Sequence, residues 1–105
     1  MDRIAAFKDF IARAPDDPFP RYGLAMEYRA QGRFKEAVEV FEELARRAPS
    51  YVATYLMFGN TLAQLGDGPA AASAYRRGIE VCSNCGDEHT RREIESALAE
   101  LGNSE

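Results

Sequence analysis

Two cysteines and the sole histidine form the one grouping in this sequence whose side chains could perform covalent or metal chemistry. Cys82 and Cys85 are separated by two residues, and His89 follows four residues later. Paired thiolates at this spacing can supply half of a structural zinc site, but a tetrahedral site needs four ligands. The chain offers three ligands of the right kind, so Asp87 or Glu88 would have to add an oxygen, or two chains would have to share the metal.

The same cysteine pair has two other interpretations. A redox pair with this spacing is typical after a strand, whereas a helix is expected before Cys82. The favoured interpretation is two ordinary cysteines in a turn, with Cys85 mildly reactive because a helix begins near Asp87. No serine or acid has the context of a catalytic triad, and the glycines at 66–68 suit a helix–helix turn. We therefore expect no cofactor and no enzymatic activity.

Length and charge limit the class of protein further. The 105 residues suit a single domain, 1–105, of which 46% are hydrophobic. No apolar run reaches the roughly 20 residues that span a bilayer, and an acid at position 2 argues against a signal peptide. The net charge is −4, and basic residues alternate with acids, which disfavours nucleic acid or a membrane surface as partner. With only two cysteines we expect a cytoplasmic protein, and the excess of arginine over lysine hints at a bacterial source.

A 34-residue repeat organises the elements that must position these side chains. Large positions stay large, small positions stay small, and a glycine recurs where each first helix should stop. The first copy has Leu24, Ala25, Tyr28, Gly32, Ala37, Phe41 and Pro49, and the second has Phe58, Gly59, Leu62, Gly66, Ala71 and Tyr75. A period of this length predicts an all-α fold of stacked antiparallel helical hairpins.

The repeat extends to both sides of these two copies. The pattern of Val38, Phe41, Leu44, Ala45, Ala48 and Pro49 also occurs 34 residues earlier, at Ile4, Phe7, Phe10, Ile11, Ala14 and Pro15. The segment 2–14 is therefore predicted to be the second helix of an earlier repeat, followed by repeat 1 at 18–49 and repeat 2 at 52–83. After a turn at 82–86 the phase slips by two residues, and 87–101 is predicted as a capping helix, giving about six helices.

These residues call for a comparison with a known family. The series Leu-Ala-x2-Tyr, Ala-x3-Phe and Pro within residues 24–49, and Phe-Gly-x2-Leu with Ala-x3-Tyr within 58–75, resemble the tetratricopeptide repeat. The resemblance covers two repeats and the helix in front of them, and it implies a right-handed superhelix. Arg21 and Tyr55 replace a frequent early tryptophan, and Ser83 replaces the closing proline of the second copy.

The resemblance also implies a binding surface, because first helices in this family line a concave groove. The corresponding positions are Phe19, Tyr22, Met26 and Arg29, then Ala53, Leu56, Met57, Asn60 and Gln64, then His89, Arg92, Glu93 and Ser96. The lysine and asparagine clamp that some members use for chaperone carboxylates has no counterpart at Tyr22, Met26, Met57, His89 and Glu93.

Such a groove favours an apolar or amphipathic segment of a partner protein, since methionine adapts to irregular surfaces and aromatic side chains anchor interfaces. Some of these side chains, Leu56 and Met57 above all, would instead pack between helices. Two other functions stay open: a metal- or thiol-dependent assembly unit that uses Cys82 and Cys85, and a self-associating module that forms a homodimer.

Overall fold

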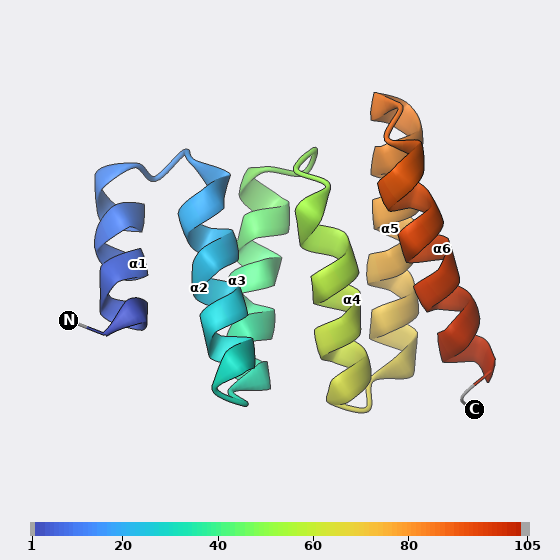
Figure 1. Cartoon of the computed structure of the whole chain (residues 1–105), viewed down its shortest axis with the longest axis horizontal. Helices are drawn as coiled ribbons and strands as arrows, with labels where there is room; N and C mark the ends of the chain where they lie inside the picture. The colour runs from blue at the N-terminus through green and yellow to red at the C-terminus, as the bar shows by residue number, and fades with distance from the viewer. Residues whose placement is uncertain (1, 104–105) are drawn as a thin grey trace.

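The structure, a computed structural model, describes residues 2–103, and within that range it is built from helices without a strand. In chain order the helices are α1 (Arg3–Arg13), α2 (Pro18–Ala30), α3 (Phe34–Arg47), α4 (Ala53–Gln64), α5 (Gly68–Cys85) and α6 (Glu88–Asn103) (Figure 1). The predicted all-α stack of helical hairpins is confirmed. None of the described helices is both long and apolar enough to cross a membrane.

Local signals at the helix ends explain where the helices begin and stop. The carboxylates of Asp2, Asp17 and Asp67 each accept a hydrogen bond from a backbone N–H two or three residues further on, at 2.8–3.1 Å. These bonds satisfy amide groups that a helix start leaves unpaired. Gly32 and Gly66 adopt φ values of 74° and 83° after α2 and α4, a left-handed conformation that closes a helix at little cost for glycine.

The end of α5 differs from the prediction. The sequence predicted a helix that stops near Cys82, whereas α5 continues to Cys85 and is 18 residues long, against 14 for α3. The physical reason is Ser83, which stands where a proline closes the first repeat and does not break the helix. The helix stops at Gly86, with φ 79°, and the two-residue phase slip is absorbed by this longer helix, whose end projects beyond its neighbours in Figure 1.

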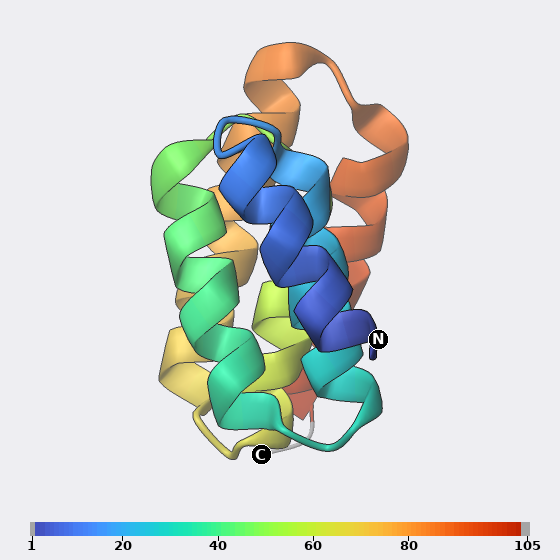
Figure 2. The same cartoon turned by 90° about the vertical axis from the view of Figure 1, so that its left-hand side faces the viewer.

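The helices form two layers, and their contacts make the stack curve. In one layer α2 contacts α4 and α4 contacts α6, while α3 and α5, both fully described, do not touch each other. Figure 2 shows α3 and α5 on one side of the molecule and α2 and α6 on the other. Because the layer of α2, α4 and α6 is the more closely spaced one, it forms the inner side of the curve.

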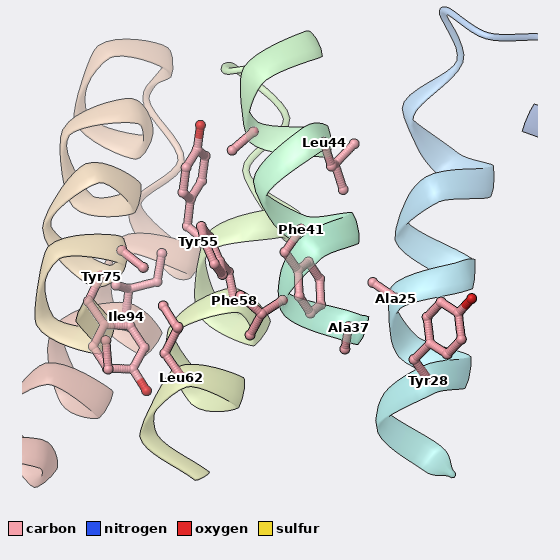
Figure 3. Close-up of a cluster of buried hydrophobic side chains, with 14 of the residues drawn as sticks. Ala25, Tyr28, Ala37, Phe41, Leu44, Tyr55, Phe58, Leu62, Tyr75 and Ile94 are labelled. Carbon is pink, nitrogen blue, oxygen red and sulfur yellow. The ribbon is translucent and has the colours of Figure 1, made fainter. Parts of the chain in front are cut away.

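The core between the layers uses the small and large positions of the repeat (Figure 3). Ala25 and Ala37 are fully buried between α2 and α3, and the rings of Phe41 and Phe58 stack at 5.9 Å between repeats. Ile94 of α6 is also fully buried. This placement agrees with the two-residue shift inferred for the last helix, although α6 begins at Glu88 and runs on to Asn103.

The corners before α2 and α4 have the same geometry. The Arg21 guanidinium and the Tyr55 hydroxyl, 34 residues apart, donate hydrogen bonds to the carbonyls of Pro15 and Pro49, each at 2.5 Å. Both residues therefore tie the start of a first helix to the preceding corner. This shared role accounts for two positions that depart from the usual tryptophan.

Candidate protein-interaction surface

The predicted groove residues all lie on the inner helices α2, α4 and α6, and one hydrogen-bonded cluster joins the first two. Arg29 on α2 donates from Nη1 to Thr61 Oγ1 at 2.7 Å and to Gln64 Oε1 at 2.6 Å, both on α4. The Arg29 guanidinium also lies over the ring of Phe34, 6.0 Å from its centroid. The structure therefore holds one cation in place on the inner side of the stack.

Thr61 was not among the predicted site residues. Its side chain is fully buried, and its hydroxyl donates to the Met57 carbonyl at 2.6 Å, so that its oxygen also serves as an acceptor for Arg29. The sequence carried a signal for it, since Thr61 lies 32 residues after Arg29, in the next first helix. A buried acceptor under an arginine is a second-layer contact that a surface pattern does not identify.

Asn60 and Met57 lie in the middle of α4 and belong partly to the packing. The Asn60 Oδ1 atom accepts a hydrogen bond from the Tyr75 hydroxyl at 2.6 Å, and its Nδ2 lies 3.7 Å from the Met57 sulfur. Beside Asn60 is a hollow of about 180 Å³ between α4, α5 and α6, lined also by Ala63, Ala97 and Leu101. Met57 and Leu56 are half-buried against the core.

Tyr22 is held in the structure more firmly than a free binding residue would be. Its ring makes edge-to-face contacts with Phe41 at 6.3 Å and with Tyr51 at 6.1 Å. Burial raises the pKa of the Tyr22 phenol above its ordinary value. Replacing Tyr22 would therefore disturb the junction of α2, α3 and α4 as well as any binding surface.

Phe19 and Met26 line a different surface from the cluster around Arg29. Together with Phe7 and Phe10 they border an apolar groove of about 540 Å³ between α1 and α2. Phe10 and Phe19 are 54% and 61% exposed, which makes them the two most exposed large apolar residues among those described. We call this surface the α1–α2 groove.

The residues predicted on α6 lie in solvent. The imidazole of His89 is 89% exposed, and its Nε2 lies 3.4 Å from the Glu93 carboxylate on the same helix. Arg92 is also exposed. The structure thus places the predicted site residues in three groups: Phe19, Tyr22 and Met26 in the α1–α2 groove, Arg29 with the α4 residues, and His89 with Arg92 on the outer part of α6.

The cysteine pair lies in the last turn of α5 and not in a loop. Cys82 is 1% exposed and belongs to the core, where burial raises the pKa of its thiol, while Cys85 is exposed and donates from Sγ to the Cys82 carbonyl at 3.6 Å. The expectation of two cysteines in a turn is wrong because α5 continues past them. Within residues 2–103, no three His, Cys, Asp or Glu side chains are grouped so that they could hold a metal ion.

Comparison with known proteins places this geometry in a family. A sequence model described as "Tetratricopeptide repeat" matches residues 22–82. A tetratricopeptide repeat domain protein from Salinibacter ruber, solved in solution, is 34% identical to this chain. The match covers 87% of this chain and 92% of that one, with a TM-score of 0.82. No curated protein sequence matches the chain.

Two more distant structures share the fold and were solved with ligands. The TPR2B domain of yeast Sti1, in a complex with pHsp70, is 17% identical, with a TM-score of 0.90 over 97% of this chain and 82% of that one. The type III secretion chaperone SycD of Yersinia enterocolitica, in complex with a peptide of the translocator YopD, is also 17% identical, with a TM-score of 0.85 over 96% and 78%.

Proposed function

The chain belongs to the tetratricopeptide repeat family, and from this premise we propose that it is a non-enzymatic adaptor that binds a peptide or helix of another protein. The binding face is the inner side of the stack, formed by α2, α4 and α6. Fold relatives whose structures hold a peptide or tail of another protein support this class of function. The observation that carries the choice of face is the cluster of Arg29, Thr61 and Gln64.

The cluster supports binding because its cation is oriented before any ligand arrives. Two hydrogen bonds and the Phe34 ring hold the Arg29 guanidinium, and this arrangement uses Nη1 and leaves other N–H groups of the fork for a ligand. A fixed donor loses little conformational entropy when it binds a carbonyl or carboxylate. Half-buried Met57 and Leu56 add an adaptable apolar surface beside it. The ligand is thus an amphipathic segment with an acceptor group for Arg29.

The other two functions receive less support. A thiol- or metal-dependent assembly would have to use Cys82, which is 1% exposed in the core. We also place the protein in a bacterial cytoplasm, a setting supported by its two free cysteines and by similar structures from Salinibacter ruber and Yersinia enterocolitica.

The proposal is tested by affinity capture from a lysate of the source cell, with quantitative mass spectrometry and a matched pair of variants. Arg29→Ala removes the inner cation, and Arg46→Ala removes a cation on α3, where its side chain is 69% exposed. We expect a partner that is enriched by the wild type and by Arg46→Ala but not by Arg29→Ala, with both variants equally helical. Equal enrichment by both variants would place the binding face elsewhere.

A further inference from the structure

The pair α1 and α2 repeats the geometry of the pair α3 and α4. Ala14 ends α1 with φ −136° and ψ 69°, and Ala48 ends α3 with φ −134° and ψ 68°. The hydrogen bonds from Arg21 and Tyr55 to the preceding proline carbonyls are also equal in length. The surface across α1 and α2 therefore corresponds, residue by residue, to the surface across α3 and α4.

The two surfaces differ in what covers them. On the α3–α4 surface, Phe41 and Leu44 are fully buried, and α2 packs there, with the Tyr22 ring against Phe41 and Arg29 bonded to α4. Thirty-four residues earlier, Phe7 is half-buried and Phe10 is 54% exposed. All ten residues that line the α1–α2 groove are 34 residues before positions of the α3–α4 surface. Within residues 2–103 no helix lies over them.

We propose that the α1–α2 groove is a second binding site, and that it accepts an amphipathic helix of another protein in the pose that α2 takes on α3 and α4. This site lies at the end of the stack and is separate from the inner face proposed above. Its occupant completes the packing that the rest of the chain makes for itself. The groove of about 540 Å³, with the exposed rings of Phe10 and Phe19 at its edges, supplies the apolar seat.

Charge defines the occupant more closely. The acceptor Thr61, which α4 offers to Arg29, corresponds to Glu27 on α2. The Glu27 side chain is only 17% exposed, and the cation nearest to it is Arg3, at 3.7 Å, which is 81% exposed and therefore weakly held. A basic residue on the incoming helix, at the position that Arg29 has on α2, would lie beside Glu27. The expected pattern is that of α2 itself: an aromatic residue, a small residue three positions later, and an arginine or lysine four positions after that.

A second copy of the chain does not offer such a helix. In α2 and α4 the small residues of this stripe, Ala25 and Gly59, are already buried in the fold. In α6 the corresponding position is Glu95, which pairs with Arg91 at 2.9 Å on an exposed face. A copy could therefore donate a first helix only by unfolding a hairpin, so the occupant we propose comes from another protein.

The test uses a peptide with the sequence of residues 17–31, labelled with a fluorophore and titrated with the full chain by fluorescence anisotropy. We expect saturable binding to one site. The substitution Phe10→Glu should weaken it at least about tenfold, because it puts a charge into the apolar seat. Leu65→Glu is the matched control, since Leu65 is 39% exposed and lies outside the groove. A peptide carrying Arg29→Glu should also bind more weakly, since it meets Glu27.

Each other outcome overturns the proposal. Absence of saturable binding to a folded chain, or equal binding by the Phe10→Glu and Leu65→Glu chains, removes the groove as a helix site. A dimer in light scattering that Phe10→Glu dissociates and Leu65→Glu does not would make a second copy the occupant. The protein variant Arg29→Ala should bind the peptide like the parent, so this test fails or succeeds independently of the inner-face proposal.

Discussion

Gly59 is the position where the structure makes its sharpest prediction about packing. It lies in the middle of α4 with a helical backbone and is buried against α5. A Cβ atom added there would lie 2.2 Å from Tyr75 Cε1 and 2.4 Å from Tyr75 Cδ1. Ordinary carbon contacts are about 3.5–4.0 Å. The substitution Gly59→Ala therefore requires the ring of Tyr75, or the whole of α5, to move by more than about 1 Å.

Two opposing effects set the size of the change. Alanine favours a helix over glycine by about 1 kcal/mol, whereas overpacking a core typically costs about 1–3 kcal/mol. Tyr75 cannot turn away cheaply, because it is 3% exposed and its hydroxyl is bonded to Asn60 at 2.6 Å. The clash is severe enough that we expect the upper part of that range. The free energy of unfolding should fall by about 1–2 kcal/mol, which lowers the Tm by several degrees in a domain of this size.

The assay is urea unfolding followed by circular dichroism, arranged as a double-mutant cycle. In the background Tyr75→Leu the ring is gone, so Gly59→Ala should become neutral or stabilising there. Gly102→Ala is the control for helix propensity, since nothing lies within 4 Å of its added Cβ. If Gly59→Ala is as stable as the parent, or costs the same in both backgrounds, the packing of α5 on Gly59 described above is wrong.

Three further predictions concern single groups. Iodoacetamide should modify exposed Cys85 quickly and buried Cys82 only on unfolding, as peptide mass spectrometry of native and denatured samples would show; equal rates would contradict the raised pKa and burial of the Cys82 thiol. The Thr54 hydroxyl is buried without a hydrogen-bond partner, so Thr54→Val should raise the free energy of unfolding by about 1 kcal/mol in urea titration, and a loss would reveal a partner. The pKa of Glu43 is lowered to about 2 by hydrogen bonds from the two arginines in the following turn. Its contribution is thus present above the unfolded pKa of about 4.3 and is lost as the pH falls toward 2; Glu43→Gln should flatten this part of the stability profile, and an NMR titration midpoint near 4.3 would refute the lowered pKa.

Repeat spacing predicted the fold well because it records burial. Residues such as Ala25 and Phe41 must be small or large wherever two helices meet, and a 34-residue period repeats that requirement. Helix ends were predictable where a strong local signal exists, as at Gly32. The end of α5 was not, because Ser83 neither stops nor requires a helix, and the choice depends on whether the extended turn can bury Cys82. That energy belongs to the tertiary structure.

The candidate site was harder to predict because a repeat pattern tells which residues share a helix face but not which neighbour that face meets. Phe19, Met26 and Arg29 all belong to the exposed side of one helix in sequence terms. In the structure the first two face α1 and the third reaches α4. The information that separates them was nevertheless present in the spacing, since Phe10 corresponds to fully buried Leu44. A position that is buried in one repeat and exposed in another marks a surface that the same packing rules can still cover, and this is why the α1–α2 groove is best explained as a seat for a helix.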